Sequence, residues 1–337
     1  MATGPTAYKV EDKSILLPFY RRFLVDPLLP LLPATLNPNT ITHTGHLLNL
    51  FGTMLLIALW PERGWPFVVA MLCLQAYMWC DNADGSHARR TNQCSAFGEF
   101  LDHGLDQLNT VYISYLTCLA LHVSPLWWVA IALLIPAAGA VTYWEQSETG
   151  VFRLGLLNQV ESLSVLSAAL TASAIFGTGI WTDVKLFGVT LQLAIVGWTA
   201  STILFGMVRA VIRVAKHRGI SAVAPILGLM AFGGTLVLAA SVGAVPTIMA
   251  VALCTGANVY VGMRMLARRL HGERPRIDLL LLAGAVGLGA LASWRAMGHD
   301  QSPWLAPGIA VVSCIIFGAL AIGDTRRSIV HLHATTR

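Results

Sequence analysis

Four aspartates form two closely spaced pairs in one short stretch of the chain. Asp81 and Asp84 are three residues apart, and Asp102 and Asp106 are four apart. On helices each pair lies on one face, one turn apart. Carboxylates gathered in this way repel one another unless cations lie between them, and hard oxygen ligands suit Mg²⁺ or Mn²⁺. The aspartates therefore predict a site for two divalent ions, which can hold the oxygens of a phosphate group during a displacement.

Small residues and two arginines accompany the aspartates. Gly85, Ala88 and Gly98 would let a bulky ligand or a neighbouring helix approach the backbone. Purely structural ion pairs are the alternative explanation for the acids, but Arg89 and Arg90 are too few to neutralise four carboxylates. Ionisable groups beside hydrophobic segments are costly and usually functional.

These residues together follow the pattern D-x2-D-G-x2-A-R-x8-G-x3-D-x3-D, from Asp81 to Asp106. The pattern resembles the motif of the CDP-alcohol phosphotransferases, membrane enzymes of phospholipid synthesis. The resemblance implies that the aspartates bind two metal ions and that a CDP-alcohol binds beside them. The motif residues expected to contact this substrate are Asp81, Gly85, Ala88, Arg89 and Gly98.

The composition predicts an all-α integral membrane protein. The chain is 55% hydrophobic and 12% charged, with a mean hydropathy of +0.66, whereas soluble domains are about 25% charged. Ten apolar stretches approach the roughly 20 residues that a transmembrane helix needs. Residues 1–37 are expected to form a cytoplasmic segment, 38–210 the catalytic helices, and 211–337 helices for lipid access or dimer packing. The predicted spans are 41–60, 65–82, 100–121, 125–143, 160–177, 186–208, 221–241, 245–266, 277–297 and 304–322.

The distribution of positive charge predicts the orientation. With ten spans both termini fall on one side, which then holds 19 of the 22 lysines and arginines. The positive-inside bias places this side, both termini and the aspartates in the cytoplasm. The net charge of +5 therefore reflects topology and attraction to anionic lipid, and no nucleic-acid partner is expected. A bacterial inner membrane is the expected location, because arginine outnumbers lysine as in GC-rich genomes; in a eukaryote it would be the endoplasmic reticulum.

The segment before the first span mixes apolar and basic residues. Residues 14–30 are too short and too broken by proline to span, so an amphipathic helix in the membrane interface is expected, acting as an anchor or as a lid. Pro38-Asn39-Thr40-Ile41-Thr42 follows. Proline is common at a helix start, which favours a simple cap. The family resemblance instead implies that Asn39 and Thr42 contact the nucleotide.

Three local features resemble the choline and ethanolamine phosphotransferases within this family. They are Ala88-Arg89-Arg90-Thr91-Asn92, the histidine in Asp-His103-Gly-Leu-Asp, and the run from Trp144 through Gly150 and Arg153 to Glu161. Asn158 departs from the branch, where an acid is expected. The resemblance implies CDP-choline or CDP-ethanolamine as donor, diacylglycerol as acceptor and CMP as product.

Two other functions remain open at this point. Another enzyme of the family would use CDP-diacylglycerol or CDP-inositol. A divalent-cation transporter would place its acids near the bilayer midplane and show repeated halves, whereas these acids cluster at one predicted face with no visible repeat.

A hydroxyl nucleophile needs a proton acceptor. The resemblance gives Asp106 as the usual base, and His103 is the candidate of this branch, since a neutral imidazole is a better base near pH 7. Glu161 is expected either to orient His103 or to serve as a helix N-terminal acid. Arg153 is expected to bind a phosphate or to be only a topological charge.

The remaining residues indicate packing. The six cysteines show no zinc-ligand spacing and are interpreted as small apolar residues. The glycines of the seventh to ninth predicted spans suit close contacts between helices, either within the chain or across a dimer interface. A homodimer is therefore among the expected partners.

Overall fold

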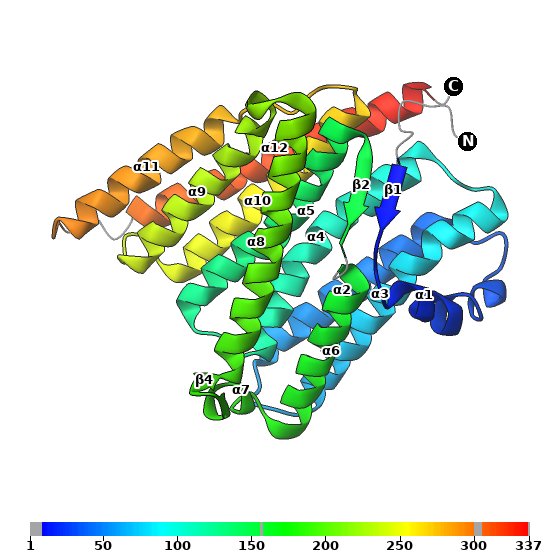
Figure 1. Cartoon of the computed structure of the whole chain (residues 1–337), viewed down its shortest axis with the longest axis horizontal. Helices are drawn as coiled ribbons and strands as arrows, with labels where there is room; N and C mark the ends of the chain where they lie inside the picture. Colours follow the sequence, from blue (N-terminus) through cyan, green and yellow to red (C-terminus); the bar gives the residue numbers. More distant parts are fainter. Residues whose placement is uncertain (1–8, 156–157, 300–304, 336–337) are drawn as a thin grey trace. The chain divides into compact units, whose positions relative to one another are not determined.

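The computed structural model describes residues 9–155, 158–299 and 305–335, and most of them are helical (Figure 1). Ten helices in this part of the chain have 18 residues or more. The predicted all-α membrane fold is confirmed, and each of these helices overlaps one of the ten predicted spans. They are α2 (Pro38–Leu59), α3 (Trp65–Thr91), α4 (Ala96–Ala120), α5 (Pro125–Thr149), α6 (Gln159–Phe176), α8 (Leu191–Arg218), α9 (Ala224–Ser241), α10 (Thr247–Leu270), α11 (Leu279–Ala296) and α12 (Leu305–Thr335).

Shorter elements connect these helices. Two small sheets were not expected from the sequence, β1 with β2 and β3 with β4. The short helices are α1 (Leu17–Tyr20), the π-helix η1 (Arg21–Val25), the 3-10 helix η2 (Leu29–Leu31), α7 (Ile180–Asp183) and η3 (Ile220–Val223). The strands are β1 (Lys9–Asp12), β2 (Val151–Leu154), β3 (Lys185–Leu186) and β4 (Val189–Thr190).

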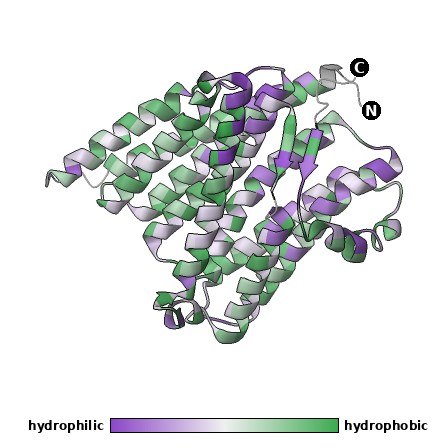
Figure 2. Ribbon diagram, viewed as in Figure 1, coloured by the Kyte–Doolittle hydropathy of each residue, from purple (hydrophilic) through white to green (hydrophobic). Residues whose placement is uncertain are grey.

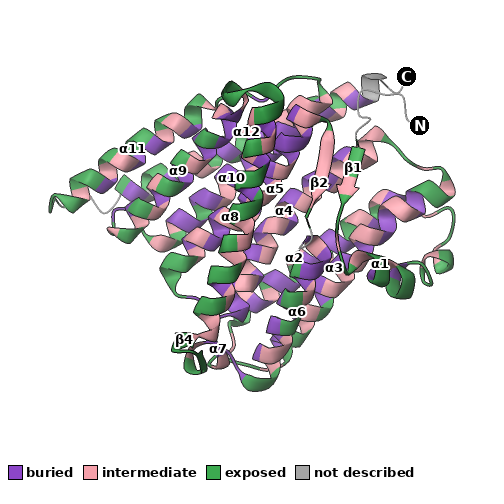
Figure 3. Ribbon diagram, in the orientation of Figure 1, coloured by how far each residue is buried: buried purple, intermediate pink, exposed green. Residues whose placement is uncertain are grey.

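Eight helical segments in the described ranges are long and apolar enough to cross a membrane. They correspond to α2, α5, α6 and α8 to α12, of which α9 is extended by η3. Figure 2 shows hydrophobic residues along most of α9 and α11, and Figure 3 shows exposed residues along α11 and α8. Hydrophobic side chains exposed along long helices suit contact with lipid. The helices α3 and α4 carry the charged motif, which explains why they are absent from the eight.

The chain forms two compact units, each assembled from separate segments. The motif unit comprises residues 10–123 and 153–199, and the C-terminal unit comprises residues 1–9, 124–152 and 200–337. All four motif aspartates belong to the motif unit. The functional division at residues 37 and 210 stays a prediction.

Close packing of α2 on α3 positions the first half of the motif. A Cβ at Gly45 would lie 2.6 Å from the Cβ of Cys80, and one at Gly52 would lie 2.7 Å from the Cβ of Cys73. The two glycines and the two cysteines are each seven residues apart, so α2 lies against α3 over two turns. Cys73 and Cys80 are buried free thiols, as their interpretation as packing residues predicted.

Polar contacts and caps position α4. The side-chain amide of Asn49 donates to Oδ1 of Asn109 at 2.9 Å and joins α2 to α4. Ser95 caps α4 by accepting from the Gly98 N–H at 3.0 Å, which supplies one of the partners that a helix start lacks. Asn92 ends α3 in the left-handed region with φ 57°, where asparagine is tolerated. The chain therefore turns sharply and brings α4 back beside the acidic end of α3.

The C-terminal unit packs its helices through small residues and through an ion pair between α5 and α8. A side chain at Gly284 would meet the Phe232 ring at 2.8 Å, so the close contacts expected from the glycines occur within this unit. Arg213 of α8 contacts both carboxylate oxygens of Glu145 of α5, at 2.5 and 2.7 Å. Truncating Arg213 would remove both of these hydrogen bonds from the mostly buried Glu145, which is costly.

Candidate active site

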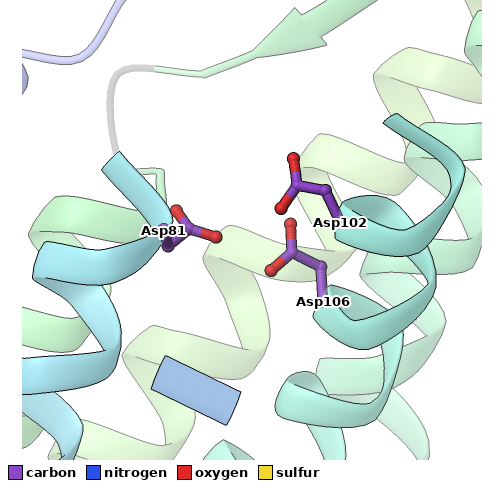
Figure 4. A group of neighbouring side chains, drawn as sticks. All are labelled: Asp81, Asp102 and Asp106. Carbon is purple, nitrogen blue, oxygen red and sulfur yellow. The ribbon is translucent and has the colours of Figure 1, made fainter. Parts of the chain in front are cut away.

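Three aspartates of the motif converge in the motif unit. Asp81 extends from α3, and Asp102 and Asp106 extend from α4 (Figure 4). One carboxylate oxygen from each lies within 4.8 Å of the others. Oδ1 of Asp102 is also buried without a hydrogen-bond partner. A buried acceptor without a donor and two neighbouring carboxylates are what a hard divalent cation requires, so these residues fit the predicted metal ions.

The fourth aspartate, Asp84, lies beside this group and has its own partners. Oγ1 of Thr42 donates to Oδ2 of Asp84 at 2.5 Å, and the Gly85 N–H lies 2.5 Å from Oδ1. Asp84 is close enough to Asp81 and Asp102 for their charges to interact. Thr42, a predicted nucleotide contact, is thus hydrogen-bonded to Asp84, a predicted metal ligand.

The small motif residues are tightly surrounded. A Cβ at Gly98 would lie 3.2 Å from Oδ1 of Asn39, so these two predicted substrate contacts adjoin each other. A Cβ at Gly85 would lie 3.3 Å from Nη1 of Arg89. Ala88 is buried. Larger residues at these positions would displace the polar groups beside the acids.

Tyr77 is a site residue that the sequence analysis missed. Its hydroxyl donates to Oδ1 of Asp106 at 2.9 Å and accepts from Nε2 of Gln159 at 3.0 Å. Tyr77 precedes Asp81 by four residues, so both lie on one face of α3. That spacing could have identified Tyr77, whereas nothing near Gln159 in the sequence indicates its contact.

Glu161 has partners other than the predicted one. It is the third residue of α6 and forms a capping box with Asn158. Its Oε1 accepts from the Ser14 hydroxyl at 2.7 Å and from the N–H groups of Ile15 and Leu16 at 2.8 Å each. Of the two expected roles of Glu161, the observed contacts match that of an acid at the N-terminus of a helix. Its orienting role toward His103, a buried residue of α4, stays a prediction.

The strand β2 and the start of α6 hold the N-terminal segment. Nε of Arg153 lies 3.1 Å from Oε2 of Glu11, and binding of phosphate by Arg153 stays a prediction. Nδ2 of Asn158 donates to Oδ1 of Asp12 at 2.8 Å. An acid in place of Asn158 would face Asp12 without a proton to donate, which gives a physical reason for this departure from the expected pattern.

The expected interfacial helix is divided into α1, η1 and η2. Pro27 and Pro30 lie in its second part, where they limit regular helix formation. Phe19 and Phe23 are exposed, as an interfacial segment requires. Tyr20 faces inward, and its burial, together with the Asp81 carboxylate, raises its pKa to about 12.

The sequence signature of the CDP-alcohol phosphatidyltransferases matches residues 35–316, which include both helices that carry the aspartates. The chain belongs to the CDP-alcohol phosphatidyltransferase family. The predicted resemblance is therefore confirmed.

Several relatives within this family carry the name cholinephosphotransferase 1. The protein from Gallus gallus is 32% identical over 208 residues, covering 58% of this chain and 61% of the relative. The protein from Danio rerio is 31% identical over 196 residues, covering 55% and 50%. An uncharacterized class-I family protein from Dictyostelium discoideum is 30% identical over 185 residues, covering 52% and 46%. The matched region thus spans less than two thirds of each relative's own length.

Proposed function

We propose that this chain transfers phosphocholine or phosphoethanolamine from a CDP-alcohol to the hydroxyl of diacylglycerol and releases CMP. The observation that carries the proposal is the group formed by Asp81, Asp102 and Asp106, within a motif of a family that acts on CDP-alcohols. The similarity to cholinephosphotransferases supports the choice of head group.

The metal ions in this proposal are Mg²⁺ or Mn²⁺. Asp81, Asp102 and Asp106 would hold them together with Asp84, and the orphaned oxygen of Asp102 supports this assignment. When bound, such ions neutralise phosphate charge and stabilise the leaving oxygen. The remaining contributions come from protein side chains that position the reactants.

The reaction exchanges one phosphorus–oxygen bond for another. The acceptor oxygen attacks the phosphorus that carries the alcohol, the bond from this phosphorus to CMP breaks, and the hydroxyl proton passes to a base. His103 and Asp106 are the two candidates for this base. The hydrogen bond from Tyr77 to Asp106 stabilises the charged form of Asp106 and so opposes its protonation, although burial of the carboxylate acts in the other direction. This contact favours His103.

The nucleotide would lie against the motif face of α3 and the start of α2. Thr42 hydrogen-bonds to Asp84, and Asn39 lies beside Gly98, which precedes Asp102 by four residues on α4; both observations support this placement. Arg89 lies over Gly85 and would contribute positive charge toward the phosphates. Ala88 would pack against the nucleotide, and Arg153 of β2 would bind a phosphate.

The proposal also includes location and assembly. The positive-inside bias supports a cytoplasmic site with both termini cytoplasmic, in the bacterial inner membrane or the endoplasmic reticulum. The glycine-containing helices of the C-terminal unit support a homodimer. Cysteine labelling from either side of sealed vesicles would test the orientation.

A donor comparison tests the proposed reaction. Purified protein would receive diacylglycerol, Mn²⁺ and either CDP-choline or CDP-ethanolamine, and CMP and the lipid product would be measured. Parallel reactions would contain CDP-diacylglycerol with inositol phosphate or glycerol phosphate. We expect product only with the first two donors. Product only with CDP-diacylglycerol would assign the chain to another activity of the same family.

A further inference from the structure

Two guanidinium groups converge on one hydroxyl at the edge of the acidic motif. Nη2 of Arg21 lies 2.5 Å from Oγ of Ser86, and Nη2 of Arg89 lies 3.2 Å from the same oxygen. Arg21 comes from η1 in the N-terminal segment, whereas Ser86 and Arg89 belong to α3. Residues 65 positions apart in the sequence thus meet beside Gly85 and Asp84.

The Ser86 hydroxyl cannot neutralise two positive charges. It is neutral, and it also contacts the carbonyl oxygen of Asn82 at 3.3 Å. Asp84 is near enough for its charge to interact with Arg89, but both its oxygens already accept from Thr42 and from the Gly85 N–H. Two like charges held together repel, and an anion between them removes that cost.

Contacts on both sides of Arg21 fix its position. Residues 14–16 are held by Glu161, through the Ser14 hydroxyl and two backbone N–H groups. Nε1 of Trp79 donates to the carbonyl of Leu24 at 2.9 Å, and Arg90 donates to the carbonyl of Leu32 at 2.8 Å. The segment is therefore attached to α6 before Arg21 and to α3 after it, so Arg21 faces α3 without having to be ordered by a ligand.

We propose that Arg21 and Arg89 form a clamp for the diphosphate of the nucleotide, with Ser86 occupying the phosphate position in the free protein. Guanidinium groups bind phosphate oxygens through paired N–H donors. Gly85 has no side chain between Ser86 and Asp84, so a phosphate bound there would adjoin the acidic group. The inference rests on the proposed function and assigns the N-terminal segment a direct role in binding substrate.

The adjacent residue provides a matched control. Arg22 is exposed, and its guanidinium lies 5.6 Å from the centroid of the Phe23 ring. It has the same charge and belongs to the same helix, but within the described residues it forms no hydrogen bond or ion pair with α3. Arg22→Ala therefore changes the net charge of the segment as Arg21→Ala does, without removing a group from the clamp.

Calorimetric titration of the purified full chain tests the clamp. CDP, CMP and cytidine would each be titrated in the presence of Mn²⁺ into wild type, Arg21→Ala, Arg21→Lys and Arg22→Ala. We expect Arg21→Ala to weaken CDP binding by about ten- to a hundredfold, the range for a charge-assisted hydrogen bond. Cytidine affinity should stay unchanged, Arg21→Lys should recover part of the CDP affinity, and Arg22→Ala should behave as wild type.

Thermal unfolding without nucleotide separates a binding role from a structural one. Loss of a repelled charge should leave the melting temperature of Arg21→Ala at or above that of Arg22→Ala. Unchanged CDP affinity in Arg21→Ala would overturn the clamp, and so would an equal loss of CDP and cytidine affinity. Failure of the wild type to bind CDP or CMP would instead overturn the proposed function, and the clamp with it.

Discussion

At the scale of single residues, the main open choice is the proton acceptor. His103 and Asp106 are three residues apart on α4, and Asp106 already accepts from Tyr77. We expect His103→Ala to reduce transfer by about 10²- to 10⁴-fold, the usual cost of losing a general base, while CDP binding stays nearly intact. Product formation and calorimetric titration would be measured on the same preparation. If His103→Ala keeps near-normal turnover while Asp106→Asn is inactive and still binds Mn²⁺, the base is Asp106.

The Tyr77 hydroxyl supplies the second prediction at this scale. Tyr77→Phe removes the donor to Asp106 and the acceptor for Gln159. A hydrogen bond to a charged group is worth about 1.5–3 kcal/mol, and solvent or an ion at the site will replace part of it. We therefore expect kcat to fall by roughly tenfold with little change in CDP affinity. Tyr112→Phe, further along α4, is the control; equal losses in both variants would show that the Tyr77 contact has no special role.

At the scale of helices, close contact between α2 and α3 holds the motif in place. The Cβ of an alanine at Gly45 or Gly52 would meet a cysteine Cβ at 2.6 or 2.7 Å. Overpacking of this kind costs about 1–3 kcal/mol, so Gly45→Ala should unfold at lower temperature and lose activity. Gly206→Ala in α8 is the control, because nothing lies within 4 Å of its Cβ. Equal melting temperatures for the two variants would contradict the packing assignment.

The N-terminal segment depends on Glu161. Its carboxylate receives three donors from residues 14–16, so Glu161→Gln should weaken the attachment of this segment to α6. We expect faster hydrogen exchange over residues 14–24, measured by mass spectrometry, with little change elsewhere. Ser162→Ala alters the next residue, which is exposed, and should exchange as wild type does. Unchanged protection in Glu161→Gln would show that other contacts hold the segment.

Helix positions and the acidic group could be predicted from the sequence because both depend on local pattern. Apolar stretches of span length located the ten helices, and spacing of three and four residues placed aspartates on shared faces. Contacts between distant segments have no such signal. The paired β1 and β2, the partners of Glu161 and the meeting of Arg21 with Ser86 depend on how loops return to the helices. Gln159 and Tyr77 likewise meet only because α6 packs on α3.

At the scale of the whole molecule, the two units show different kinds of packing. The motif unit carries the carboxylates, the predicted nucleotide contacts and the attached N-terminal segment. The C-terminal unit consists largely of apolar helices, and the Glu145–Arg213 pair joins two of them. This distribution suits the proposals that the chemistry takes place in the first unit and that the second serves lipid contact or assembly, while the predicted division at residue 210 differs from the bounds of the two units.

The central claim is that the carboxylates of α3 and α4 hold divalent ions that the transfer of the phosphoalcohol requires. Its most direct test is CMP release from CDP-choline and diacylglycerol by the purified chain, with and without EDTA and Mn²⁺. We expect release to stop in EDTA and to return with excess Mn²⁺. In Asp81→Asn, Asp84→Asn and Asp102→Asn we expect losses of about 10³-fold or more, as for removal of a principal electrostatic group, with helical content unchanged. Full activity in EDTA, or of Asp102→Asn, would contradict the account.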